Sequence, residues 1–190
     1  HVPVDFAILP GNTDEENETR FTMAIAAIEP GTGAVRALVG GPRFKEAKFN
    51  LATQGERQPG SSFKTFVLIA ALEAGFVPDD TISGVGPCLF DNTGSANPIY
   101  TVNNFGNSEG SVDTLVNHVT RSSNGGFVRL GQAVGIPNVI ETANRLGLKL
   151  DPVLDNNKSL PLGTTEVRPL EVASAYATIA NRGVRHEPYY

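Results

Sequence analysis

The sequence predicts an α+β fold, in which an antiparallel sheet is flanked by helices. Two observations carry this prediction. The early part of the chain contains two short apolar runs rich in strand-forming residues, with a turn signal between them. From Ser61 onward, most apolar segments have the length of helices and are bounded by proline and glycine. Strands followed by a series of helices favour α+β over a regular α/β alternation.

The predicted strands form a β-hairpin. Phe21–Ile28 and Ala34–Val39 are the apolar runs, and Glu-Pro-Gly-Thr-Gly at 29–33 is the turn between them. Two strands alone do not make a stable sheet. No segment after Gly183 is expected to add a strand, so the sheet is expected to be incomplete in this chain. The polar and acidic residues 10–20 belong to an exposed linker or entry segment, predicted over residues 1–20.

The remaining elements are predicted to be mostly helical. The first helix, over Ser61–Ala74, is apolar almost all round and is therefore expected to be buried, with Gly75 ending it. Residues 81–110 are rich in Gly, Asn, Ser and Pro, which predicts a long loop or short irregular strands. Four further helices are expected: one with Ser111 as N-cap, ending in a break near 122–126, and others over 127–134, 139–146 and 170–180.

The composition excludes several classes of protein. The chain has 190 residues, 40% hydrophobic and 18% charged, with a net charge of -5, which is typical of a globular domain and argues against a nucleic-acid partner. The single cysteine, Cys88, cannot form an internal disulfide and is expected to be buried. The sequence shows no metal-ligand spacing and no phosphate-binding lysine motif, so no cofactor is predicted. No apolar run reaches the ~20 residues that span a bilayer, so no membrane span is predicted within these residues.

Ser61 and Lys64 form the first candidate catalytic pair. Three residues apart on a helix, they would share one face. In the first turn, unpaired backbone N–H groups and the helix dipole would stabilise a developing alkoxide, and the Ser61 N–H could form half of an oxyanion hole. Burial among apolar residues would lower the pKa of Lys64, so that a neutral amine could accept the serine proton. The alternative is a helix cap followed by a lysine that reaches to solvent, because Ser-x-x-Lys is a common pattern.

A second polar cluster lies at Ser122-Ser123-Asn124. Taken alone, these residues are typical of a turn that ends a helix. No spacing among the three histidines supports a Ser-His-Asp triad, and His118 is expected to be structural. Asp79-Asp80 is interpreted as a solvated turn.

Four separated segments together resemble the transpeptidase domain of class A penicillin-binding proteins. Phe49–Lys64 resembles the nucleophile region, including Ser-x-x-Lys at 61–64, and 122–124 resembles the Ser-x-Asn motif. Ile28–Gly41 resembles the opening strand pair, and Leu162–Ala177 resembles the approach to the next helix. The four segments occur in the order of that family.

The resemblance implies a serine DD-transpeptidase with the penicillin-binding protein/β-lactamase-like fold. Ser61 would be the nucleophile and Lys64 its base, Ser122 would relay a proton to the leaving amine, and Asn124 would hold a substrate amide and orient Lys64. The implied partners are peptidoglycan stem peptides and β-lactam antibiotics. The implied location is the bacterial cell envelope, on the extracytoplasmic face of the cytoplasmic membrane, with a glycosyltransferase domain and an anchor upstream.

The family's third motif, Lys-Thr-Gly, does not occur among these residues. Residues 21–190 are therefore interpreted as the N-terminal part of the domain, with a second polypeptide expected to carry the rest. Two alternatives remain open. The chain could be a non-catalytic module that binds cell-wall peptide, or a β-lactamase, although no acid is placed as a clear deacylating base.

Overall fold

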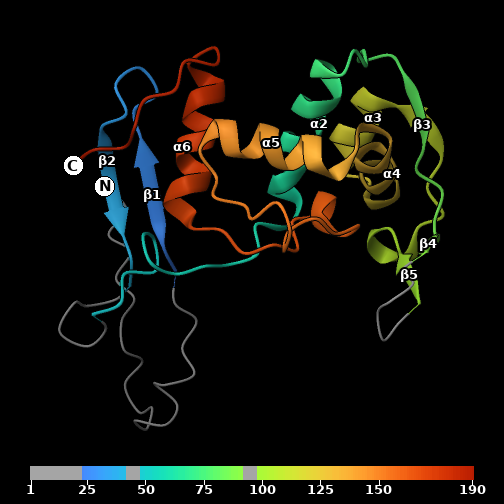
Figure 1. Ribbon diagram of the computed structural model, residues 1–190, viewed down its shortest axis with the longest axis horizontal. Coiled ribbons are helices and arrows are strands. Elements are labelled where there is room, and N and C mark those ends of the chain that lie inside the picture. Colours follow the sequence, from blue (N-terminus) through green and yellow to red (C-terminus); the bar gives the residue numbers. More distant parts are fainter. Residues whose placement is uncertain (1–22, 42–47, 92–97) are drawn as a thin grey trace, which may run out of the picture. The chain divides into compact units, whose positions relative to one another are not determined.

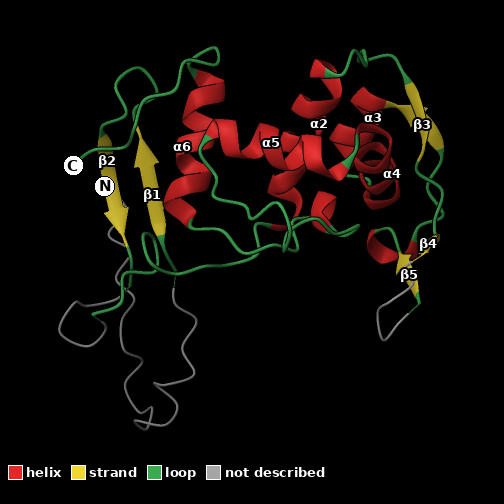
Figure 2. Cartoon of the chain, viewed as in Figure 1, coloured by secondary structure: helices red, strands yellow, loops and turns green. Residues whose placement is uncertain are grey.

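A computed structural model describes residues 23–41, 48–91 and 98–190 of the chain (Figure 1). They belong to two compact units, one formed by 1–56 with 168–190 and the other by 57–167. The linker predicted over residues 1–20 lies outside the described residues. Figure 2 shows that both helices and short strands are present, as the α+β prediction requires.

The first unit contains the predicted hairpin. Strands β1 (Ile25–Ile28) and β2 (Val35–Val39) pair antiparallel, with a register shift between Ala27 and Ile28. Helix α6 (Pro169–Ala180) packs against β1 (Figure 1). Proline opens this helix, as expected for a residue that lacks the N–H and has a preset φ.

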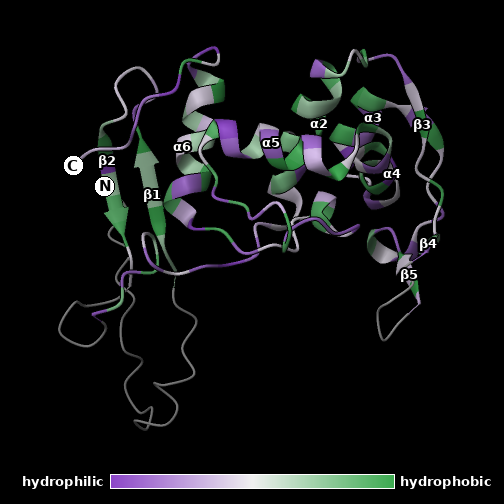
Figure 3. Cartoon of the chain, in the orientation of Figure 1, coloured by the Kyte–Doolittle hydropathy of each residue, from purple (hydrophilic) through white to green (hydrophobic). Residues whose placement is uncertain are grey.

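The hairpin is apolar on both faces, and Figure 3 colours most of β1 and β2 as hydrophobic. Ile25 and Val39 are paired across the strands and both are exposed. Tyr189 joins the start of β2 through a parallel bridge to Ala34. The expectation that nothing after Gly183 would pair with the sheet is therefore wrong at one position: Val35 N donates to Tyr189 O at 2.8 Å.

The second unit is built around α2 (Lys64–Glu73), which follows a 3-10 turn, η1 (Gly60–Phe63). The single helix predicted over Ser61–Ala74 is thus divided into two parts. Gly75 lies just beyond its end with φ +95°, the left-handed conformation predicted for it. The expectation of burial all round is only partly right, because α4 and α5 cover one side of α2 and leave Leu72 43% exposed.

Four short strands follow in two antiparallel pairs. Strand β3 (Thr81–Ser83) pairs with β6 (Val112–Thr114), and β4 (Cys88–Asp91) pairs with β5 (Ile99–Val102), while η2 (Phe105–Asn107) is a 3-10 turn. This agrees with the short irregular strands predicted for 81–110. Ser111 is not a helix N-cap, because the residues after it are engaged in β6. Thr114 caps the helix instead, accepting from Asn117 N at 3.3 Å.

Three further helices complete this unit: α3 (Leu115–Arg121), α4 (Asn124–Val134) and α5 (Ile136–Leu146), with a 3-10 turn η3 (Leu160–Leu162). The predicted break at 122–126 is confined to Ser122 and Ser123. Gly125 and Gly126 both lie within helix α4. A Cβ at Gly126 would lie 2.7 Å from His118 Nδ1, and one at Gly125 would lie 2.8 Å from Gly84 O, so a larger residue would not fit at either position. These glycines serve close packing rather than a turn.

Cys88 is buried with Val102 and Val128 in a small apolar cluster, as expected for it. Within the described parts of the chain, every helix is too short or too polar to cross a membrane.

Candidate active site

Ser61 lies in the turn η1 at the start of α2, and its side chain is exposed. Phe63 and Phe66 fix the turn to the core, because both are fully buried and pack edge to face with ring centroids 5.3 Å apart. The residue before the serine, Gly60, has φ +56°, a conformation that glycine adopts without strain. The apolar packing of Phe63 and Phe66 therefore positions Ser61 at the surface.

A second segment, residues 163–167, fixes the approach to this turn. Arg57 and Val167 exchange two backbone hydrogen bonds of 3.0 Å, and Gly60 N donates to Gly163 O at 3.2 Å. Gly163 has φ +71°, and a Cβ there would overlap Gly60 O. Only glycine allows this approach, so the segment 163–167 acts as a clamp on the turn that carries Ser61.

Lys64 is the first residue of α2, and its side chain is 4% exposed. Its Nζ donates three hydrogen bonds: 2.7 Å to Ser122 O, 3.1 Å to Ser122 Oγ and 2.8 Å to Asn124 Oδ1. The Phe127 ring lies 5.6 Å away. Burial lowers the pKa of Lys64 to about 8, because desolvation disfavours the ammonium form.

The turn between α3 and α4 directs Ser122 and Asn124 toward this amine. Ser122 has φ +51°, an uncommon left-handed conformation for a residue with a side chain. Ser123 then caps α4 by accepting from Gly126 N at 3.1 Å, and Asn124 opens the helix. Such strain tends to occur where function requires a particular geometry. Here it allows one residue to offer both its carbonyl and its hydroxyl to Lys64.

The structure thus brings Lys64, Ser122 and Asn124 into direct contact and places Ser61 one helical turn before the lysine. Their catalytic roles stay predictions. The Ser61 hydroxyl makes no hydrogen bond to another described residue and is available to a ligand. His118 is buried in α3, where its Nε2 lies 2.8 Å from Ile82 O, a contact that holds α3 to β3.

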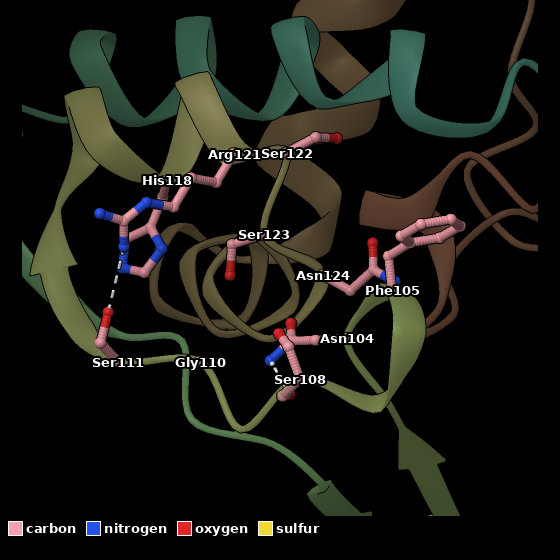
Figure 4. Close-up of a pocket in the computed structure, with 10 residues that line it drawn as sticks. All are labelled: Asn104, Phe105, Ser108, Gly110, Ser111, His118, Arg121, Ser122, Ser123 and Asn124. Atoms are coloured by element: carbon pink, nitrogen blue, oxygen red, sulfur yellow. Dashed lines mark hydrogen bonds between the residues drawn. The ribbon is translucent and has the colours of Figure 1, made fainter.

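A pocket of about 190 Å³ lies beside the turn between α3 and α4 (Figure 4). Ser122, Ser123 and Asn124 form one wall, and Phe105, which is 95% exposed, stands on another. The buried Asn104 also lines it, and sequence reasoning missed this residue, because an asparagine in a turn-rich segment is expected to face solvent. Among the residues of the described ranges, no cluster of His, Cys, Asp and Glu could hold a metal ion.

Comparison with known proteins identifies the family of the chain. A sequence model of the family described as penicillin binding protein transpeptidase domain matches residues 23–190. Penicillin-binding protein 1A of Pseudomonas aeruginosa is 34% identical over 166 residues, which cover 87% of this chain and 20% of that protein. Penicillin-binding protein 1A of Neisseria lactamica is 37% identical over 166 residues, 87% of this chain and 21% of that protein.

Solved structures show the same fold. Penicillin-binding protein 1A from Haemophilus influenzae superposes with a TM-score of 0.80 at 32% identity, covering 87% of this chain and 24% of that one. The PonA1 protein from Mycobacterium tuberculosis in complex with penicillin V gives a TM-score of 0.74 at 28% identity, covering 87% and 45%. The fold is therefore that of the penicillin-binding protein transpeptidase domain. The chain belongs to the penicillin-binding protein transpeptidase family, and it spans about a fifth of the length of the curated relatives it matches.

Proposed function

We propose that this chain carries the nucleophile and general base of a serine DD-transpeptidase that cross-links peptidoglycan stem peptides. The observation that supports this most is the environment of Lys64. Lys64 is buried, has a lowered pKa and donates to Ser122 and Asn124. It follows the exposed Ser61 by three residues at a helix start, an arrangement that suits base-assisted acyl transfer.

In the first step, Ser61 Oγ attacks the carbonyl of the penultimate D-Ala of a donor peptide, and neutral Lys64 accepts the hydroxyl proton. The oxyanion that forms is stabilised by the Ser61 N–H at the start of the helical segment. The tetrahedral intermediate collapses by breaking the C–N bond. Ser122 Oγ passes its proton to the departing amine of D-Ala and takes up in its place the proton that Lys64 accepted, so Lys64 is neutral again and the peptide remains as an ester on Ser61.

In the second step, the amine of a neighbouring stem peptide attacks this ester and gives a proton to neutral Lys64. The C–O bond to Ser61 breaks, Lys64 returns the proton to Ser61 Oγ, and the amide that forms is the cross-link. Asn124 Nδ2 has two hydrogens, and one of them is given to Asn103 O at 3.0 Å. The other is free to bind a carbonyl of the donor peptide. β-Lactams would acylate Ser61 through the same first step.

The relatives are bacterial proteins of the penicillin-binding type, so the proposed location is the bacterial cell envelope, at the extracytoplasmic face of the cytoplasmic membrane. The Lys-Thr-Gly motif is not among the 190 residues. Since the relatives are about five times longer than the matched region, we propose that chain outside this sequence supplies the motif, the second oxyanion N–H, an upstream glycosyltransferase domain and an anchor.

A non-catalytic module and a β-lactamase are the competing functions. A module that only binds cell-wall peptide would need no buried lysine beside an exposed serine. A β-lactamase would need a base for deacylation, but Glu166 is exposed and lies on the clamp segment 163–167.

The test uses the protein in its full length with a stem pentapeptide donor and an amine acceptor. We expect release of D-Ala together with a cross-linked product, and loss of both in Ser61→Ala. Binding of the peptide without D-Ala release would establish the non-catalytic module. Rapid turnover of penicillin to its hydrolysed form would establish the β-lactamase.

A further inference from the structure

Asn104 is buried where three stretches of backbone cross, and every polar atom of its amide has a partner. Its Oδ1 accepts from Gly125 N at 3.0 Å, and its Nδ2 donates to Gly84 O at 2.8 Å and to Ser108 O at 3.3 Å. The residue follows strand β5 and precedes the turn η2. It therefore joins the segment 103–108 both to the start of α4 and to the end of β3.

The backbone segments around the Asn104 amide approach one another so closely that only glycine fits at two positions. A Cβ on Gly125 would lie 2.8 Å from Gly84 O, and one on Gly110 would lie 2.7 Å from Asn104 Nδ2. Figure 4 shows Asn104, Ser108 and Gly110 together beside the pocket, with the Asn104–Ser108 contact drawn. Glycines at these positions allow the backbones to approach closely enough for one amide side chain to bridge them.

The segment held by Asn104 also sets the orientation of Asn124. The carbonyl of Asn103 accepts from Asn124 Nδ2 at 3.0 Å, which leaves Oδ1 facing Lys64 Nζ at 2.8 Å. An amide has a donor end and an acceptor end. If the Asn103 carbonyl moved away, Asn124 could turn its NH2 toward the ammonium and lose the contact with Lys64.

We infer that Asn104 is a positioning residue for acylation, which acts through the Asn103 carbonyl and Asn124 on the orientation of Lys64. The inference rests on the proposed function, since it assigns Lys64 as the base. Asn104 touches neither the nucleophile nor Lys64. Its contribution is to hold the carbonyl that selects the productive orientation of the Asn124 amide.

The test measures acylation of the full-length protein by a fluorescent penicillin under single-turnover conditions. The amplitude reports the fraction of folded, reactive molecules, and the rate constant reports the chemistry in those molecules. We expect Asn104→Ala to lower the rate constant by roughly tenfold, the scale of coupling between residues in one hydrogen-bond network. In an Asn124→Ala background, the same substitution should have almost no further effect on the rate constant.

Asn107→Gly is the matched control. The Asn107 side chain is exposed on the same segment 103–108, and glycine suits its φ of +55°, so this variant should leave the rate constant near that of wild type. If Asn104→Ala does not fold, Asn104→Ser serves instead. It keeps a small neutral polar group but is too short to bridge Gly84 O and Gly125 N–H, and we expect it to acylate slowly.

A purely structural role would lower the melting temperature and the amplitude while leaving the rate constant of Asn104→Ala at the wild-type value, and that result would overturn the inference. An equal effect of Asn104→Ala with and without Asn124 would do the same. Failure of the proposed function itself looks different, because the wild-type protein would then not be labelled, or Ser61→Ala would still be.

Discussion

Lys64 donates to three uncharged oxygens, and no carboxylate forms a salt bridge with it among the residues that the structure describes. A carboxylate partner would stabilise the ammonium and raise the pKa. Carbonyl, hydroxyl and amide oxygens orient the amine without a full counter-charge, so desolvation decides the protonation state. A neutral amine has two hydrogens, so Lys64 would release one of its three contacts when it acts as the proposed base.

The pH dependence of acylation follows from this environment. Since burial lowers the pKa of Lys64 to about 8, the neutral base is lost as the pH falls below that value. We expect the acylation rate constant to fall roughly tenfold per pH unit well below the pKa, and to level off above it. Stopped-flow labelling between pH 5.5 and 9.5 measures this profile. A rate that is flat from pH 6 to 9 would show that Lys64 is not the base.

Ser122 and Ser123 are neighbours with separate predicted duties. Ser122→Gly removes the hydroxyl, keeps the carbonyl bonded to Lys64 and suits the φ of +51°. We expect near-native stability but acylation slowed by about 100-fold or more, the usual contribution of a proton-transfer group. Ser123→Ala removes the cap of α4 and should cost about 1 kcal/mol in the free energy of unfolding. Its acylation rate should change far less, and the reverse ranking of the two variants would contradict these roles.

At the scale of elements, the clamp segment 163–167 connects stability to catalysis. Gly163→Ala combines a positive φ with overlap against Gly60 O, so it should both destabilise the protein and displace the turn that carries Ser61. Gly75→Ala is the matched control, because it also has a positive φ but no atom within 4 Å of its Cβ.

We expect each substitution to cost about 1 kcal/mol or more in the free energy of unfolding, the penalty of a left-handed residue with a Cβ. Only Gly163→Ala should also slow acylation of the folded molecules. Denaturant unfolding combined with labelling kinetics separates the two quantities. Equal labelling rates for the two variants would show that segment 163–167 does not position Ser61.

Some elements of the fold could be predicted from the sequence alone, and others could not. The hairpin, the helix after Ser61 and its stop at Gly75 were predictable, because apolar periodicity and glycine placement are local signals. The N-cap at Ser111 was a wrong prediction, since tertiary pairing of β6 with β3 overrides the capping signal. Ser122 and Asn124 became candidates only through the resemblance of 122–124 to the Ser-x-Asn motif, since their residue types alone are typical of a turn, and their catalytic roles stay predictions. Asn104 was not predictable, as its partners lie 20 and 21 residues away along the chain.

At the scale of the whole molecule, this chain carries the residues proposed as nucleophile and base, and it belongs to a family whose curated members are about five times longer than the region it matches. The four residues proposed for catalysis all belong to the unit formed by 57–167. Their arrangement depends on contacts within that unit: the clamp on Ser61, the apolar packing around Lys64 and the turn between α3 and α4. The proposed chemistry is therefore prepared within one compact part of the chain.

Ser61 is proposed as the residue that is acylated, and peptide mapping by mass spectrometry after the full-length protein has reacted with penicillin tests this directly. We expect a single penicilloyl adduct on the peptide that contains Ser61, formed in the wild type and absent from Ser61→Ala, with Ser62→Ala as the neighbouring control that remains acylated. An adduct on another residue, or one that persists in Ser61→Ala, would contradict it.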